Sequence, residues 1–362
     1  MLQFPGYNKD TPGGTGADLE ALKASALPIV LYGDGWYAPY VRRFLAREGL
    51  KPAACFTDAG FTSSGEALSF AEVSARFEKF NVVIAFANAA LAREKLSRLG
   101  GGQAGVYFFD VMGPLLGNTM DAAYVERHRA GFAAAHALLS DEVSRRTFEA
   151  FISAKLTGEA GPLAAVACKE QYFVRGIMDL REDEVFVDGG AYTGDTLLTF
   201  ARITGGRYAR CRAFEPEPAN AGKLREAVAR RRLENVEISV KGLWSRPATL
   251  PFAVIEGSSA SAFSGCGREL AEVDTVDNAA PDATFIKLDV EGAELEALKG
   301  ASATIKRNRP KLAVCVYHRP SDLFEIPLFI DSLGAGYRFW LRQHQPVACE
   351  TVLYAVPGPG RG

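Results

Sequence analysis

The stretch that decides the fold is VFVDGGAYTGDT, residues 185–196. It begins as an apolar run rich in β-branched residues, passes through a glycine-rich turn and continues into the helical pattern of residues 197–201. A strand, a tight turn and a helix start bring backbone N–H groups close to a bound nucleotide. The pattern therefore predicts the first strand–turn–helix unit of a nucleotide-binding α/β domain.

A carboxylate further along the chain fits a nucleoside. Glu215 ends the next predicted strand, 21 positions after Gly194. An acidic residue at the end of this strand suits the two hydroxyls of a ribose. We therefore expect Glu215 to contact the ribose of the ligand.

The charges around the turn distinguish between two kinds of nucleotide. A dinucleotide site directs a helix N-terminus at a pyrophosphate and usually reads G-x-G-x-x-G. Here Asp188 precedes the glycines, Ala191 stands at the middle glycine position and Asp195 opens the helix. Two carboxylates would repel a pyrophosphate and attract an ammonium or a sulfonium. S-adenosylmethionine carries both cations and a ribose, so it is the favoured ligand; alternatively, Asp195 only complements the helix dipole.

Four blocks in the second half of the chain carry a family resemblance. They read FVDGGAYTGD (186–195), FEPEP (214–218), IKLDVEGAE (286–294) and YHRPSDL (317–323). In this order they resemble the FkbM-type S-adenosylmethionine-dependent methyltransferases. The resemblance implies a Rossmann-like class I methyltransferase sheet, mostly parallel with one antiparallel strand. It also implies O-methylation of a hydroxyl on a sugar, a polysaccharide precursor or a secondary metabolite.

The periodicity of the chain predicts two α/β domains joined by helices. The last two predicted strands, 337–342 and 351–356, are too close for a helical crossover, so they should pair antiparallel. A β-rich insertion covers roughly 243–280, and its serines, between 257 and 264, are candidates for acceptor contacts or a lid. We predict four segments: an N-terminal arm (1–26), a small Rossmann-like α/β domain (27–112), a helical connecting segment (113–180) and the S-adenosylmethionine-binding methyltransferase domain (181–362).

The smaller domain has a glycine turn of its own. GDGWYA at 33–38, followed by Asp58, resembles a dinucleotide fingerprint, and no acid precedes its first glycine. The unit stops after about four strands, whereas a full dinucleotide fold has about six. We expect it to serve packing. An NAD-dependent oxidoreductase using this turn is the alternative function, and a non-catalytic binding module is another.

The ligand of an open α/β sheet lies beyond the carboxyl ends of its strands. Leu243 and Trp244 follow the third strand, where the adenine should lie, although a buried structural tryptophan fits equally. Tyr172 belongs to a segment that resembles part of the family's helical region, and it either reaches the cofactor or packs on the sheet. The predicted cofactor-binding residues are Asp188, Gly189, Gly190, Ala191, Tyr192, Gly194, Asp195, Thr196, Glu215, Pro216, Leu243, Trp244, Asp289 and Tyr172.

Methyl transfer to an alcohol requires alignment and a base for the acceptor's proton. His318 ends a predicted strand at the crevice, and an imidazole suits a base at neutral pH. We predict His318 and Asp289 as catalytic residues, Asp289 holding the methionyl ammonium or the acceptor hydroxyl. A hydrogen-bonded structural histidine is the alternative. Asp289, Glu291 and His318 could also bind a divalent metal, but hard cations prefer several oxygens, so a metal is possible but not favoured. Glu294 is expected to complement the helix dipole.

The composition excludes several classes of partner. Lys plus Arg total 41 against 43 Asp plus Glu, so there is no net basic field for nucleic acid. No apolar run approaches the ~20 residues of a membrane span, and the first 20 residues lack a signal sequence. The six cysteines are scattered without C-x-x-C spacing, which indicates thiols in a reducing compartment. We therefore expect a cytoplasmic enzyme with a small-molecule or carbohydrate acceptor; its oligomeric state is left open.

Overall fold

The computed structural model divides the chain into two compact units. One comprises Met1–Arg129, Glu149–Ala167 and Gln345–Ala348, and the other Ala130–Phe148, Cys168–His344 and Cys349–Gly362. The predicted helical segment, 113–180, is thus shared between the two. The structure describes residues 14–35, 37–58, 67–86, 89–99, 101–109, 111, 120–157, 161–254, 262–263, 267, 269–345 and 349–358.

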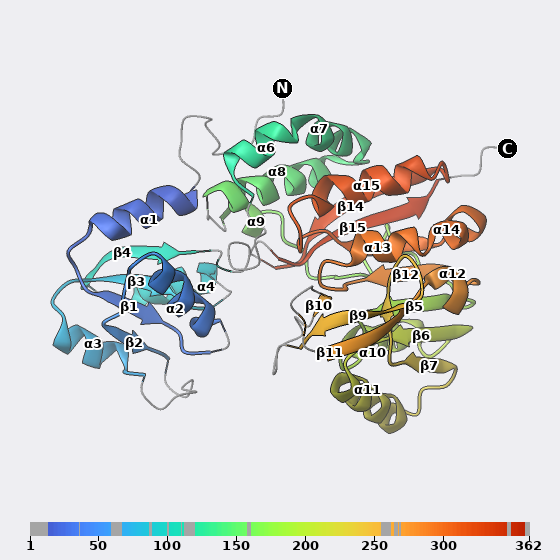
Figure 1. The fold of residues 1–362 in the computed structure, drawn as a ribbon, viewed down its shortest axis with the longest axis horizontal. Helices are drawn as coiled ribbons and strands as arrows, with labels where there is room; N and C mark the ends of the chain where they lie inside the picture. Colours follow the sequence, from blue (N-terminus) through green and yellow to red (C-terminus); the bar gives the residue numbers. More distant parts are fainter. Residues whose placement is uncertain are drawn as a thin grey trace. The chain divides into compact units, whose positions relative to one another are not determined.

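The first unit contains a four-stranded parallel sheet with the order β2-β1-β3-β4 (Figure 1). Its two central strands are buried along their whole length, because apolar clusters cover both faces of the sheet. The predicted small parallel α/β unit is confirmed. Its elements are α1 (Gly14–Ala24), β1 (Ile29–Tyr32), α2 (Ala38–Arg47), β2 (Ala54–Phe56), α3 (Phe70–Arg76), β3 (Phe80–Ile84), α4 (Ala89–Arg98) and β4 (Gln103–Phe108).

The helical pattern after residue 120 is interrupted by capping residues. The side chain of Asp121 accepts a hydrogen bond from the amide of Tyr124 at 2.7 Å, and Asp141 accepts one from the amide of Ser144 at 2.8 Å. Such caps satisfy the free amides of a new helix, so they divide the pattern. The resulting helices are α6 (Ala122–Arg127), α7 (Arg129–Leu138), α8 (Glu142–Thr157) and the short α9 (Gly161–Ala164).

The second unit is organised around a seven-stranded sheet with the order β14-β15-β13-β12-β5-β6-β7. Strand β15 pairs antiparallel with both β13 and β14, and the other neighbouring strands are parallel. This confirms the predicted sheet with one reversed strand near its edge. The strands are β5 (Val185–Gly189), β6 (Arg210–Phe214), β7 (Val236–Ser239), β12 (Phe285–Leu288), β13 (Lys311–Cys315), β14 (Tyr337–Gln343) and β15 (Thr351–Pro357).

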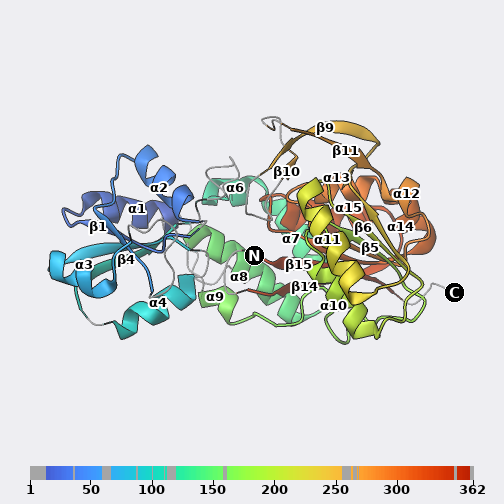
Figure 2. The same cartoon turned by 90° about the horizontal axis from the view of Figure 1, so that it is seen from below.

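Aromatic packing joins this sheet to its helices. The ring centroid of Phe186 on β5 lies 4.5 Å from that of Phe200 on α10 and 4.8 Å from that of Phe285 on β12. Leu224 of α11 belongs to the same core cluster, and Figure 1 and Figure 2 show α10 and α11 side by side. The helices of this unit include α10 (Asp195–Thr204), α11 (Pro218–Arg231), α12 (Val276–Ala279), α13 (Glu294–Lys299), α14 (Ser302–Asn308) and α15 (Asp322–Ser332).

Helices α13 and α14 are separated by a break at Gly300. A Cβ atom on Gly300 would lie 2.0 Å from the carbonyl oxygen of Trp244. The glycine therefore permits a close backbone approach that no other residue allows, and the chain turns there.

The insertion forms a separate small sheet with the order β10-β9-β11-β8, which confirms the β-rich segment. Figure 2 shows β9, β10 and β11 as a ribbon apart from the main sheet. The predicted lid serines, Ser258, Ser259, Ser261 and Ser264, lie outside the described residues. The strands are β8 (Gly242–Leu243), β9 (Ala248–Ala253), β10 (Ala262–Phe263) and β11 (Glu269–Asp274).

Two further findings bear on the compositional predictions. The five cysteines within the described residues are free thiols. In the same part of the chain, every helix is too short or too polar to cross a membrane.

Candidate active site

A cavity of about 220 Å³ opens beyond the carboxyl ends of β5, β6, β12 and β13. This is the edge where open α/β sheets bind their ligands. Its lining is polar and acidic on several sides, with apolar side chains from the small sheet. The lining residues are Gln171, Tyr172, Gly190, Tyr192, Asp195, Thr196, Glu215, Pro216, Gly242, Leu243, Phe252, Phe263, Lys287, Asp289, Val290, Glu291, Tyr317 and Glu350.

The glycine turn after β5 is tightly packed against the loop after β12. Gly190 has a φ of +72°, and a Cβ atom there would lie 1.8 Å from the carbonyl oxygen of Asp289. Gly194 has a φ of +95° and directly precedes α10. A Cβ atom on Gly194 would lie 2.6 Å from the side chain of Leu224. Both positions therefore require glycine for their conformation and for space.

A buried lysine donates hydrogen bonds to the carbonyl groups of this turn. The ammonium of Lys287 on β12 donates to the carbonyl oxygens of Gly189 at 3.1 Å and Gly190 at 2.8 Å. It also lies 3.0 Å from the carboxylate of Asp188, and neither side chain is more than 2% exposed. Burial by itself would lower the pKa of Lys287, but the carboxylates of Asp188 and Asp289 raise it above its ordinary value.

This ion pair changes the charge argument made from the sequence. Asp188 is fully buried and does not line the cavity, so its carboxylate neutralises Lys287 instead of facing a ligand. Lys287 lies 99 positions after Asp188 in the chain, and the pairing of β5 with β12 brings it beside the acids of the turn. The acids that do line this side of the cavity are Asp195 and Glu215.

Glu215 is fixed by two backbone amides. Its Oε2 accepts from the amide of Tyr192 at 2.8 Å, and its Oε1 accepts from the amide of Glu217 at 2.9 Å. A carboxylate offers about four acceptor positions, so two remain for hydroxyl groups in the cavity. The carboxylate is thus oriented before any ligand arrives.

Asp289 is held by two phenols. The hydroxyl of Tyr172 donates to its Oδ2 at 2.9 Å, and the hydroxyl of Tyr317 donates to its Oδ1 at 3.2 Å. Burial opposes its charge, but Lys287 and His318 hold the pKa of Asp289 below its ordinary value. Asp289 is therefore a fixed carboxylate at neutral pH.

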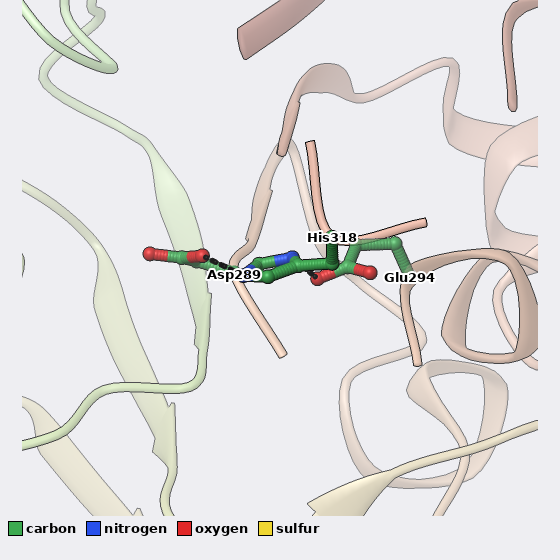
Figure 3. Close-up of side chains that lie close together, drawn as sticks. All are labelled: Asp289, Glu294 and His318. Carbon is green, nitrogen blue, oxygen red and sulfur yellow. Dashed lines mark ion pairs between the residues drawn. The ribbon is translucent and has the colours of Figure 1, made fainter. Parts of the chain in front are cut away.

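His318 lies between carboxylates on both sides of its ring. Its Nδ1 is 2.9 Å from Glu294, and its Nε2 is 3.2 Å from Glu291 and 3.7 Å from Asp289; Figure 3 shows the ring between Asp289 and Glu294. Burial alone would lower the pKa of His318, but Glu294 and Glu291 raise it well above its ordinary value.

The charge of His318 argues against the role predicted from the sequence. An imidazolium has no free lone pair to accept a proton, and His318 is not among the residues that line the cavity. Its position as a cation instead balances Glu291 and Glu294. Glu294, expected only to complement a helix dipole, is fully buried, faces His318 and accepts from the amide of Val290 at 2.8 Å.

The same cluster is where a divalent metal could bind. Ligand atoms of Asp289, Glu294 and His318 lie within 4.8 Å of one another. A protonated His318 already supplies the positive charge between these carboxylates, and a hard cation would prefer more oxygen ligands. The arrangement therefore does not require an ion for its charge balance.

The family of this fold follows from a comparison with known proteins. Residues 188–339 match the family model described as the methyltransferase FkbM domain. This span is an FkbM methyltransferase domain. The resemblance noted from the four sequence blocks is thereby confirmed, and the protein is a methyltransferase whose family implies S-adenosylmethionine as the methyl donor.

One solved structure supports the fold of this chain. Methyltransferase FkbM from Methylobacillus flagellatus KT shares 23% identity over 95% of this chain and 94% of that one, with a TM-score of 0.75. Precorrin-6y C5,15-methyltransferase from Geobacter metallireducens GS-15 is more distant, with 14% identity over 53% of this chain and 94% of that one and a TM-score of 0.34. None of the curated proteins compared with the chain matches it significantly.

The chemistry of the cavity in the FkbM domain suits S-adenosylmethionine. The left-handed Gly190 lets the turn pack against the carbonyl oxygen of Asp289, and Gly190 itself lines the cavity. Glu215 offers oriented oxygens to ribose hydroxyls, and Asp195 lines the same cavity as a partner for a cation. Leu243 adds an apolar wall on which an adenine could lie.

The predicted site residues fall into two groups in the structure. Trp244 is not among the residues that line the cavity; its ring packs against that of Phe263, which does line it, at 5.8 Å between centroids. Predicted residues that line the cavity are Tyr172, Gly190, Tyr192, Asp195, Thr196, Glu215, Pro216, Leu243 and Asp289. Predicted residues that do not line it are Asp188, Gly189, Ala191, Gly194, Trp244 and His318.

Backbone strain gathers at the cavity, and one of the strained residues is a residue that the sequence did not single out. Four of the lining residues are non-glycine residues with positive φ, and such strain tends to persist at functional sites. They are Tyr172 (+62°), Tyr192 (+46°), Glu291 (+54°) and Glu350 (+60°). The sequence pattern does not reveal Glu350, because it precedes a strand and the expected ligand-binding residues follow one.

The glycine turn of the first unit is less open to a ligand than its sequence suggests. The carboxylate of Asp58, placed where a ribose would be read, accepts from the hydroxyl of Tyr32 at 2.9 Å and is ion-paired with Lys95. Trp36 and residues 59–66 lie outside the described residues. The carboxylate of Asp58 is thus already engaged by Tyr32 and Lys95, which does not favour the binding of a dinucleotide at this turn.

Proposed function

We propose that the FkbM domain transfers a methyl group from S-adenosylmethionine to a hydroxyl of a carbohydrate or another small polyhydroxylated molecule. The observation that carries this proposal is the chemistry of the cavity. Five carboxylates line it, and among its described lining residues the single basic side chain is Lys287, which Asp188 neutralises. Carboxylates accept hydrogen bonds from hydroxyls and repel anionic groups.

The donor side of the cavity is assigned to the turn after β5 and to the end of β6. Gly190, Tyr192 and Asp195 would border the methionyl part, and Glu215 the ribose. When bound, S-adenosylmethionine supplies a methyl carbon made electrophilic by a positive sulfur. Asp195 faces that side as an anion, and Lys287 keeps the turn in place through two carbonyl oxygens.

The acceptor side is assigned to the residues that follow β12 and β13 and precede β15. Two phenolic hydrogen bonds fix the carboxylate of Asp289. In this position it would orient an acceptor hydroxyl. Gln171 lines the same region and offers an amide. His318 would act as a positioning residue, because its charge holds Glu291 beside Asp289.

The proposal is tested by donor binding and by acceptor screening. In a calorimetric titration with S-adenosylhomocysteine, Glu215→Gln should weaken binding by about 1–3 kcal/mol, the usual loss for a hydrogen bond to a charged group. Glu226→Gln, an exposed residue on α11, is the matched control and should bind like the wild type. Sugars, polyols, amines and sugar phosphates are then compared as methyl acceptors. Transfer to amines alone, or preferred transfer to phosphorylated compounds, would contradict the proposal.

A further inference from the structure

We propose that Glu350 accepts the proton of the hydroxyl that is methylated, which makes it a catalytic residue of the FkbM domain. The inference rests on the proposed transfer to a hydroxyl. Glu350 is half-buried, lines the cavity and stands directly before β15.

The reversed strand explains why a residue at this point of the chain reaches the site. Strand β15 runs antiparallel to β13, so its first residues lie at the edge where β12 and β13 end. The amide of Val316 donates to the carbonyl of Thr351 at 3.0 Å, which sets Glu350 beside Tyr317 at the cavity. In the sheet, β12 and β13 separate β15 from β5, so Glu350 and the donor turn approach the cavity from opposite sides.

The conformation of Glu350 is constrained. Its φ is +60°, a region that glutamate rarely adopts, and its carbonyl accepts from the amide of His344 at 3.0 Å. Gln171 donates a hydrogen bond to its Oε2. Within the described residues no hydrogen bond reaches Oε1, so one carboxylate oxygen is left for the acceptor.

The other ionisable groups of this region are already engaged. Both oxygens of Asp289 accept phenolic hydrogen bonds, and its lowered pKa makes it a weak base. Glu291 is ion-paired with His318, and His318 is itself a cation. Burial, followed by the charge of Asp289, raises the pKa of Glu350 to about 7. A base of this pKa is well matched to proton transfer at neutral pH.

The step balances in atoms and charge. The O–H bond of the acceptor breaks, and its proton moves to a carboxylate oxygen of Glu350. The electron pair of that acceptor oxygen forms the new bond to the methyl carbon, while the pair of the broken carbon–sulfur bond stays on sulfur. One negative charge is lost on Glu350 and one positive charge is lost on sulfur, and the proton later leaves to water.

Several groups from neighbouring elements act on the ionisation of Glu350. Gln171 favours the carboxylate by its hydrogen bond, His318 favours it by its charge, and the nearby acids oppose it. The described ionisable groups that interact electrostatically with Glu350 are Asp289, Glu291, His318, Tyr172, Tyr317 and Cys315. Because the carboxylate is the active form, turnover should rise as the pH increases through about 7 and then level off.

The experiment uses the full chain with a hydroxyl acceptor found in the screen. Glu350→Gln should lower kcat by about 10²–10⁴-fold, the range for loss of a general base, and remove the rise with pH. Its affinity for S-adenosylhomocysteine and its acceptor KM should stay within about threefold of the wild type. Glu350→Asp keeps a base and should retain an intermediate kcat. Glu325→Gln, an exposed residue on α15, is the control and should behave as the wild type.

A second measurement does not depend on turnover. In protein labelled with ¹³C-glutamate, the side-chain carboxyl signal absent from Glu350→Gln should titrate near pH 7. Titration at the ordinary glutamate value, about 4.3, would overturn the inference. So would a Glu350→Gln enzyme that keeps wild-type kcat and pH dependence while the wild type methylates hydroxyls, and that result would leave the proposed function intact. A wild type that methylates amines and no hydroxyl would refute both.

Discussion

Replacing Lys287 by methionine tests whether the buried ion pair supports the donor turn. The substitution removes a cation with three oxygen partners: Asp188, Gly189 and Gly190. It leaves the carboxylate of Asp188 at 0% exposure without a counter-charge. Breaking a buried pair from one side costs about 3–5 kcal/mol. We therefore expect the free energy of unfolding at pH 7 to fall by about that amount in urea titrations.

The loss should depend on pH in a defined direction. Without Lys287 the pKa of Asp188 in the folded protein is raised by burial above its unfolded value of about 3.9. The folded state then binds the proton more tightly, so the variant is least impaired below pH 4 and loses stability as the pH rises above it. The difference from the wild type should accordingly be smaller at pH 3.5 than at pH 7.

Two matched variants separate charge from other effects. Asp188→Asn should be milder than Lys287→Met, because the ammonium keeps its two glycine carbonyls. The double variant should be at least about 1 kcal/mol more stable than Lys287→Met alone, since no uncompensated charge remains. Lys241→Met breaks an exposed pair with Glu272 and should cost less than about 1 kcal/mol. A cost below about 1 kcal/mol for Lys287→Met, or no recovery in the double variant, would refute the reasoning.

Two further substitutions test the geometry of the turn and the charge of His318. Gly190→Ala should abolish binding of S-adenosylhomocysteine and lower the Tm, since its Cβ would lie 1.8 Å from a backbone oxygen. Gly206 also has a positive φ but open space around it, so Gly206→Ala should bind normally and lower the free energy of unfolding by about 1–2 kcal/mol. Equal effects of the two substitutions would contradict the packing argument. In the wild type, stability contributed by His318 is complete below pH 6.5 and is lost as the pH rises through its raised folded pKa. In urea titrations, the free energy of unfolding of His318→Gln should be lower than that of the wild type at pH 6.5 and should decline less steeply up to pH 9. A decline parallel to that of the wild type would show that His318 is neutral. Treatment with EDTA should leave the Tm and donor affinity of the wild type unchanged, and a large loss restored by magnesium would assign the cluster of Asp289, Glu294 and His318 to a metal.

The sequence alone determined most of the architecture. The strand–turn–helix pattern at 185–201 corresponds to β5, the glycine turn and α10. The short connection between the last two strands predicted their antiparallel pairing, which the register of β14 and β15 confirms. Local sequence determines these features, because a turn, a helix start or a short loop depends on residues a few positions apart. Helix breaks were less predictable, since the one at Gly300 depends on the backbone of Trp244.

Only the tertiary structure decided which charges face the ligand. Asp188 and Lys287 are far apart in the chain and meet because β5 and β12 are neighbours in the sheet. Glu350 reaches the cavity because the reversed β15 brings the start of a strand to the edge where others end. His318, a plausible base by sequence, becomes a cation between carboxylates. Electrostatic interactions depend on distance in space and on burial, and neither is encoded by the spacing of residues along the chain.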